Sequence, residues 1–300
     1  MKILVTGASG LVGKHLVPYL RAKDHDVYAL VRQAPANEHE IEWDAEQGFK
    51  DSELERLENF DHVIHLAGAG IADERWTRAR KKIIEESRTV GTRVLVDALG
   101  QLRNKPKTLL CASAIGYYGN RGDEILTEDS PPANDFLGNV CARWEAAAQR
   151  AKQIGVERVV NLRIGIVLSP EGGALKEMLT PFKMGVGGRV GKGTQFVSWI
   201  ELGDLVRVIE FALENARLAD AVNATAPNPV RNAEFAETLG HVLNRPSLVP
   251  TPEFAVRLMF GELADALLFA SARVIPQKLE EQNFKFKFEQ ISDALEHLLR

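Results

Sequence analysis

The sequence is poor in the features that mark metal-binding, secreted and nucleic-acid-binding proteins. Its two cysteines, Cys111 and Cys141, have neither the spacing of a metal site nor the number of a disulfide framework. We therefore expect no metal and a reducing, cytoplasmic location. The chain also lacks a basic surplus, since 37 Lys and Arg residues stand against 41 Asp and Glu residues. Nucleic acid is therefore not expected as a partner.

Long hydrophobic runs are also missing. No segment approaches the roughly 18 apolar residues that a membrane-spanning helix needs. The N-terminus has a short apolar run followed by glycines, which is typical of a strand and turn rather than of a signal peptide. We expect no membrane association and a small-molecule substrate as the partner. The sequence leaves the oligomeric state open.

The most informative stretch is Lys2 to Gly13, KILVTGASGLVG. An apolar strand leads directly into Gly7, Gly10 and Gly13, and helical spacing follows. Glycine without a Cβ lets a diphosphate approach the backbone, and the helix N-terminus offers free N–H groups and a positive dipole end. The pattern predicts dinucleotide binding at the first strand-to-helix turn. An ordinary tight turn is the alternative.

Strands and helices alternate through the first half of the chain, which predicts an α/β fold with a Rossmann-type, doubly wound parallel sheet. Within this half, Glu157 to Leu168 reads as one apolar strand. We expect residues 1–168 to form the nucleotide-binding domain, completed by segments around 202–225. Residues 169–201 and 226–300 are expected to form a smaller C-terminal region on the substrate side.

The end of the second predicted strand addresses the choice between NAD and NADP. An acidic residue there would bind the 2′-hydroxyl of the adenosine ribose and select NAD. This chain has Val31 followed by Arg32, and a guanidinium pairs well with a 2′-phosphate. The prediction is NADP, with a surface arginine as the alternative. The residues expected to bind the cofactor are Gly7, Ser9, Gly10, Leu11, Gly13, Val31, Arg32, Leu66, Ala67, Gly68, Arg88 and Val167.

Several further motifs follow the glycine turn in a fixed order. With them the chain resembles the extended short-chain dehydrogenases/reductases, and in particular their atypical "epimerase family", which is NAD-dependent epimerase/dehydratase-like. The motifs that carry this resemblance are TGASGLVG (6–13), HLAG (65–68), SAIGYYG (113–119), TEDSPP (127–132), CARWEAAA (141–148), LRIGIVLSPEGGAL (162–175), WIELGDL (199–205), VRNAEFA (230–236) and VIPQKLEE (274–281).

The resemblance implies a catalytic serine and a Tyr-x-x-x-Lys pair. Tyrosine and lysine four residues apart share one helix face, and the ammonium lowers the phenol pKa while hydride moves to or from nicotinamide. Alignment on Glu145 puts Leu137 at the tyrosine position and Cys141 at the lysine position. Ala114 falls at the serine position. None of the three suits the expected chemistry.

Two neighbouring residues are candidate replacements. Ser113 lies one position from the serine site, and Tyr117 lies in the loop that follows. Tyr117 is the stronger acid/base candidate, although an aromatic side chain here also suits a pocket wall. Arg88 stands where extended members usually have asparagine, and it is expected to face the cofactor.

Two functions are consistent with these residues. The first is an NADP-dependent, epimerase-like oxidoreductase that acts on a small polar substrate with a non-standard acid/base. The second is a non-catalytic NADP(H)-binding sensor or scaffold, suggested by the lost serine, tyrosine and lysine. Fold alone does not decide between them.

Overall fold

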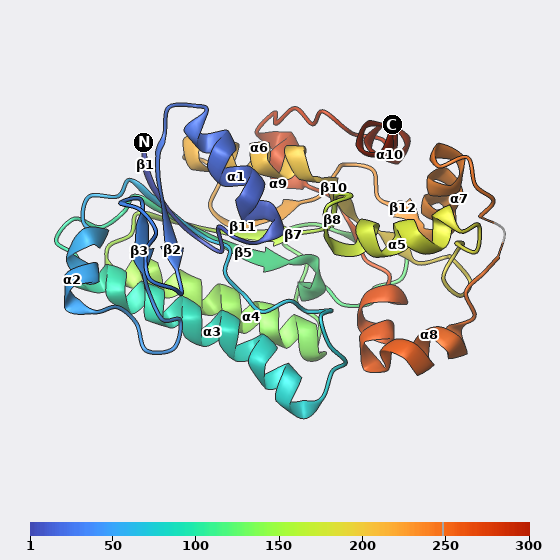
Figure 1. Cartoon of the computed structure of the whole chain (residues 1–300), viewed down its shortest axis with the longest axis horizontal. Helices are drawn as coiled ribbons and strands as arrows, with labels where there is room; N and C mark the ends of the chain where they lie inside the picture. The colour runs from blue at the N-terminus through green and yellow to red at the C-terminus, as the bar shows by residue number, and fades with distance from the viewer. Residues whose placement is uncertain (248) are drawn as a thin grey trace.

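A computed structural model describes residues 1–247 and 249–300 of the protein. Within these residues, seven parallel strands form the central sheet in the order β11-β7-β5-β4-β1-β2-β3 (Figure 1). The expected Rossmann-type, doubly wound α/β fold is confirmed. The strands are β1 (Lys2–Thr6), β2 (Asp26–Val31), β3 (Glu40–Glu42), β4 (His62–His65), β5 (Thr108–Ala114), β7 (Arg158–Ile164) and β11 (Asp220–Ala224).

The strand order reverses between β1 and β4. The chain runs outward from β1 through β2 to β3 and then returns to the other side of β1. In open parallel sheets, ligands bind in the crevice outside the carboxyl ends of strands at such a reversal. The segments that follow β1 and β4 therefore define the candidate site.

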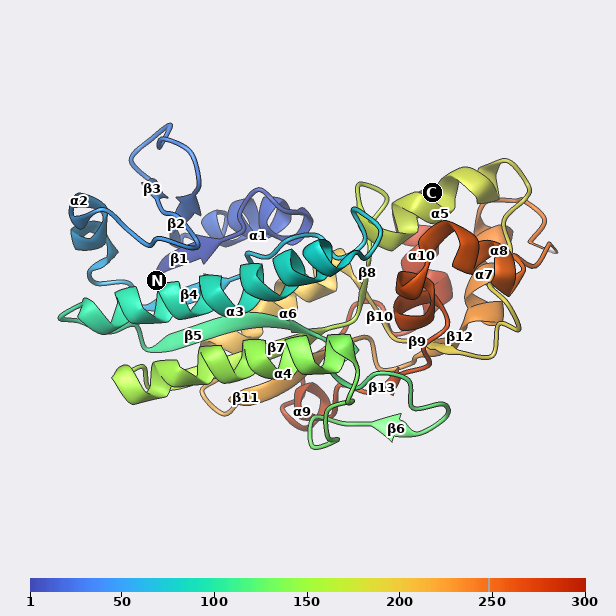
Figure 2. The same cartoon turned by 90° about the horizontal axis from the view of Figure 1, so that it is seen from below.

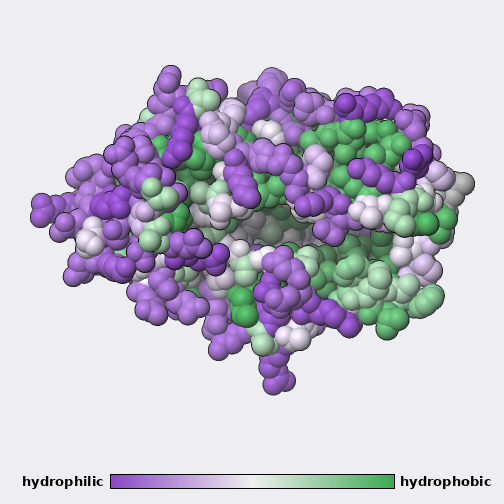
Figure 3. Space-filling model, in the orientation of Figure 1, coloured by the Kyte–Doolittle hydropathy of each residue, from purple (hydrophilic) through white to green (hydrophobic). Residues whose placement is uncertain are grey.

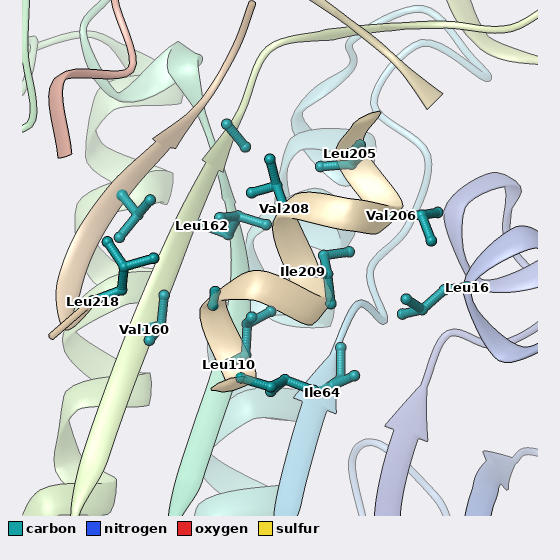
Figure 4. Packing of buried hydrophobic residues seen from close by; sticks show 14 of the residues in the cluster. Leu16, Ile64, Leu110, Val160, Leu162, Leu205, Val206, Val208, Ile209 and Leu218 are labelled. Atoms are coloured by element: carbon teal, nitrogen blue, oxygen red, sulfur yellow. The ribbon is translucent and has the colours of Figure 1, made fainter. Parts of the chain in front are cut away.

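Helices cover both faces of the sheet. α1 (Leu11–Arg21) and α6 (Leu202–Glu214) lie on one face, and α3 (Arg78–Gln101) and α4 (Phe136–Gln149) lie on the other (Figures 1 and 2). Successive strand residues face opposite sides, so Ile3 joins the first core and Leu4 the second. Figure 4 shows Val206 of α6 facing Leu16 of α1.

The predicted single strand from Glu157 to Leu168 is wrong. β7 ends at Ile164, and β8 (Ile166–Leu168) instead pairs in parallel with β10 (Trp199–Glu201). Gly165 marks the break, because a Cβ there would lie 2.8 Å from the Ser198 carbonyl oxygen. The chain thus leaves the main sheet at Gly165 and enters the region beyond the carboxyl ends of the strands.

A smaller region with its own apolar core lies beyond that edge (Figure 1). Between it and the sheet, Figure 3 shows a hollow near the middle of the visible face. The segment 202–225 supplies α6 and β11 to the main fold, and the exact domain boundaries stay a prediction. The remaining elements are α2 (Asp51–Leu54), β6 (Ile125–Leu126), α5 (Gly173–Lys183), β9 (Phe196–Val197), β12 (Val230–Arg231), α7 (Asn232–Val242), α8 (Glu253–Phe260), β13 (Arg273–Val274), α9 (Gln277–Glu281) and α10 (Ile291–Leu299).

No helix in the described part of the chain is both long enough and apolar enough to cross a membrane.

Candidate functional site

The three glycines after β1 have different structural roles. Gly7 has φ +71°, and a Cβ on it would lie 2.8 Å from the Leu66 carbonyl carbon, so only glycine fits the turn. Gly13 packs closely on the turn at Ala8. Gly10 is different, because it is exposed and the nearest atom to its ideal Cβ is the Gly7 oxygen at 3.3 Å. The missing side chain of Gly10 therefore leaves an open cradle.

The cradle lies at the N-terminus of α1. Gly10 is the N-cap residue and supplies no side-chain cap, so N–H groups of the first turn are left for an anion. Ser9 is exposed beside it, and Leu11 begins the helix. Open space at Gly10 and N–H groups without a side-chain cap are the features that a diphosphate of a dinucleotide requires.

A buried polar network fixes the loop on the other side of the crevice. Thr6 Oγ1 accepts hydrogen bonds from the backbone N–H groups of Leu66 and Ala67, both at 3.1 Å. It lies 2.7 Å from His65 Nδ1, and His65 Nε2 lies 3.0 Å from Thr92 Oγ1. Complete burial lowers the pKa of His65 to about 4, so its ring is neutral at pH 7. The network holds the segment Leu66 to Gly68 against the glycine turn.

The neighbouring strand supplies the residues expected at the adenosine end. Val31 is the last residue of β2, which pairs with β1, so Arg32 lies at the same sheet edge as the glycine turn. Arg32 is exposed, and the described residues place no carboxylate within ion-pair distance of its guanidinium. Its charge is available for a ligand phosphate.

Val167 approaches the glycine turn from a different element. It lies on β8, outside the main sheet, and packs in part against the core beneath α1. The chain after β8 reaches the turn, since an ideal Cβ on Gly172 would lie 3.2 Å from Leu11 Cδ1. The structure therefore brings the predicted cofactor residues together from β1, β2, β4, α3 and β8.

Arg88 projects from α3 toward the end of β4. An ideal Cβ on Gly68 would lie 3.5 Å from Arg88 Cζ, and Arg88 Cζ is 5.1 Å from the ring centroid of Trp144 on α4. Arg88 Nη1 donates to the Ile84 carbonyl at 3.0 Å. Burial lowers the pKa of Arg88, which is the effect expected when a cation is largely removed from water.

Ser113 belongs to a buried ionic network. Its hydroxyl donates to Glu145 Oε1 at 2.7 Å. The same carboxylate accepts two bonds from Arg163, from Nε at 2.8 Å and from Nη2 at 2.9 Å. The alternation of β5 thus directs Ser113 toward α4, where its hydroxyl supports the fold.

Tyr117 lies in the short turn after β5. The Arg163 guanidinium carbon is 3.5 Å from its ring centroid, so the ring is held by stacking. Tyr117 is half-buried, and its hydroxyl has no hydrogen-bond partner among residues 1–247 and 249–300. Unlike Ser113, Tyr117 keeps its polar group free.

The three positions that the resemblance assigns to serine, tyrosine and lysine are apolar or neutral. Ala114 ends β5, and Leu137 is buried in the first turn of α4. The turn after β5 packs on it, since an ideal Cβ on Gly116 would lie 3.4 Å from the Leu137 side chain. Burial raises the pKa of Cys141 to about 12, so its thiol is uncharged at neutral pH. None of these groups exchanges a proton at pH 7.

The Glu145–Arg163 ion pair is a feature of the site that was not predicted from the sequence. Arg163 also donates from Nη1 to the Tyr118 hydroxyl at 2.9 Å, and Tyr118 donates to Asn223 Oδ1 at 2.6 Å. A charged residue inside an apolar strand was the available signal, because arginine is rarely buried without a partner. Its partner Glu145 on α4 could not be predicted from the spacing of residues in the sequence.

Comparisons with known proteins identify the family of this chain. The model of the NAD-dependent epimerase/dehydratase family matches residues 3–224. The chain belongs to this family. A domain of unknown function, DUF1731, matches residues 251–298. Among curated relatives, the epimerase family protein Mb2239 of Mycobacterium bovis is 43% identical over 98% of this chain and 96% of its own length.

One of the solved structures that this chain resembles contains a bound cofactor. The human epimerase family protein SDR39U1 (isoform 2), solved with NADPH, has a TM-score of 0.90 and 32% identity and covers 100% of this chain and 99% of its own. A mutant UDP-glucuronic acid 4-epimerase from Bacillus cereus, solved with NAD, has a TM-score of 0.77 at 19% identity and covers 100% and 98%. The latter likeness concerns the fold alone.

Proposed function

We propose that this family member binds NADP(H) and acts as an epimerase-like oxidoreductase on a small polar substrate. The observation that carries the proposal is the open cradle at Gly10, together with Arg32 at the end of the next strand, which has no ion-pair partner among the described residues. The turn supplies N–H donors for a diphosphate, and Arg32 supplies charge for a 2′-phosphate. The bound cofactor would supply hydride chemistry. The NADPH in the human relative supports this choice over NAD.

The proposed proton-handling group is Tyr117. Within the described part of the chain its hydroxyl has no hydrogen-bond partner, while its ring is fixed on Arg163, which is the arrangement needed to meet a substrate oxygen reproducibly. Ser113 is the second candidate from the same segment. Its 2.7 Å bond to Glu145 leaves it less available, so the geometry favours Tyr117.

A second candidate function is a non-catalytic NADP(H)-binding sensor or scaffold. The favouring observation is that Ala114, Leu137 and Cys141 offer no transferable proton at neutral pH. Such a protein would keep the crevice and respond to the redox state of the cofactor. Its two buried free cysteines fit the reducing cytoplasm that we propose for it.

The test combines cofactor binding with a substrate screen. The wild-type protein is titrated with NADPH and then assayed with carbonyl compounds and sugar nucleotides for hydride transfer and for epimer exchange. Turnover that is lost in Tyr117→Phe with NADPH binding retained supports the oxidoreductase. NADPH binding without turnover across the panel supports the sensor. Absence of NADPH binding would overturn both functions.

A further inference from the structure

Arg88 carries a charge that no other described residue neutralises. Among those residues its guanidinium makes one hydrogen bond, to the Ile84 carbonyl of its own helix, and no carboxylate lies within ion-pair distance of it. Its neighbours Cys141 and Arg80 are a neutral thiol and a second cation at neutral pH, so neither supplies a negative charge. A largely buried cation without a counter-charge costs free energy unless a ligand supplies acceptor oxygens. The environment of Arg88 is therefore incomplete without a ligand.

The position of that charge relates to the missing lysine. Cys141 stands where the resemblance puts the lysine, and Trp144 follows it by three residues on the same face of α4. Arg88 Cζ lies 5.1 Å from the Trp144 ring centroid, and the Arg88 charge acts on the Cys141 thiol. The Arg88 guanidinium thus reaches the surroundings of position 141 from α3, whereas a lysine at position 141 would reach them from α4.

The small residues around Arg88 make this exchange sterically possible. Gly68 has no side chain, and an ideal Cβ on it would lie 3.5 Å from Arg88 Cζ, in contact with the guanidinium. Cys141 is smaller than lysine and is 4% exposed, so it fills its position without competing for the crevice. A lysine at 141 and an arginine at 88 would bring two like charges into one partly desolvated space.

We propose that Arg88 replaces the cation missing at position 141 and that its guanidinium holds the ribose hydroxyls on the nicotinamide side of NADP(H). This inference rests on the proposed NADP(H) binding. The resemblance puts the lost lysine beside the tyrosine that acts while hydride moves to or from nicotinamide, and the free guanidinium donors suit a pair of neighbouring oxygens. A guanidinium stays protonated across the working pH range, so Arg88 binds and positions and does not relay a proton.

Two ligands separate the halves of the cofactor. NADPH contains the nicotinamide ribose, whereas 2′,5′-ADP contains only the adenosine half with its 2′-phosphate. Dissociation constants for both are measured for the wild type, Arg88→Ala, Arg88→Gln and the matched control Arg93→Ala. Arg93 is an exposed arginine on the same helix, bonded to its own backbone.

Loss of charge-assisted bonds from Arg88 is expected to weaken NADPH by about 10- to 100-fold. The affinity for 2′,5′-ADP is expected to stay within about twofold, since this ligand lacks the proposed partner, and Arg93→Ala should change neither value. Equal weakening of both ligands in Arg88→Gln would overturn the assignment to the nicotinamide half. If the wild type binds 2′,5′-ADP and the Arg88→Gln variant binds NADPH as tightly as the wild type does, the inference about Arg88 is overturned. The proposal that the protein binds NADP(H) would then still stand.

The replacement itself is tested by moving the charge back. Arg88→Ala/Cys141→Lys is expected to recover most of the lost NADPH affinity, whereas Cys141→Lys alone should not tighten binding because two cations then share the site. Thermal unfolding confirms that each variant is folded. A folded double variant with no recovery would contradict the exchange of charge between helices. If the lysine variants do not unfold cooperatively, the contrast of NADPH with 2′,5′-ADP in Arg88→Gln decides.

Discussion

Ser113 donates its hydroxyl hydrogen to Glu145 at 2.7 Å, and this bond joins the end of β5 to α4. Glu145 is also held by two bonds from Arg163, one strand away. The three side chains are buried. A buried carboxylate depends on its donors, because an acceptor left without one carries the full cost of desolvation.

Ser113→Ala is therefore expected to lower the free energy of unfolding by about 1–2 kcal/mol. Removal of the charge in Glu145→Gln should cost more, roughly 3–5 kcal/mol, because it leaves Arg163 without its ion-pair partner. Urea unfolding measures both, and the double variant should be non-additive, since the residues share one network. A stable Ser113→Ala protein with abolished turnover would instead assign Ser113 to the chemistry.

Arg32 should discriminate between the two nicotinamide cofactors. Arg32→Ala is expected to weaken NADPH binding by about 2 kcal/mol through loss of a charge-assisted pair with the 2′-phosphate. NADH, which lacks that phosphate, should be nearly unaffected. Fluorescence titration with each cofactor measures the difference, and Gln33→Ala, an exposed neighbour, is the matched control. Equal weakening of NADPH and NADH would mean that Arg32 does not recognise the 2′-phosphate.

Gly7 and Gly10 should respond differently to the same substitution. Gly7→Ala places a Cβ at φ +71°, 2.8 Å from the Leu66 backbone, so we expect a loss of roughly 2 kcal/mol or more in stability. Gly10 has φ −76° and no closer neighbour than 3.3 Å. Gly10→Ala should therefore keep nearly all of its stability and lose cofactor affinity. Melting curves together with NADPH titrations separate these effects; full affinity in Gly10→Ala would argue against a diphosphate in the cradle.

The sequence was sufficient for the parts of the site that depend on local backbone chemistry. A strand followed by Gly7, Gly10 and Gly13 predicted the turn, and the structure shows distinct local reasons for each glycine. The alternation of strands and helices along the chain predicted the parallel sheet. This also depends on local sequence, because each strand and each helix has its own hydrophobic periodicity.

Features set by long-range contacts were not predictable. In the sequence, β7 and β8 belong to one continuous apolar run. The break between the two strands at Gly165 depends on the backbone of Ser198, which comes from a later segment of the chain. The engagement of Ser113 depends on Glu145, 32 residues away. The proximity of Arg88 to Cys141 depends on the packing of α3 on α4, which no spacing in either helix encodes.

His65 should make stability depend on pH. Burial lowers its pKa from 6.5 to about 4 in the folded protein, so the unfolded chain binds more protons between these values. The contribution of the neutral ring is fully present above pH 6.5 and is lost as the pH falls toward about 4. It amounts to roughly 3 kcal/mol at most. Urea unfolding of the wild type and His65→Asn across this range measures the difference.

The free energy of unfolding should depend less steeply on pH in His65→Asn than in the wild type. The pH dependence that remains should include the contribution of His62, because burial also lowers the pKa of His62 to about 4. Identical slopes in the two proteins would show that the His65 ring is not held neutral between Thr6 and Thr92.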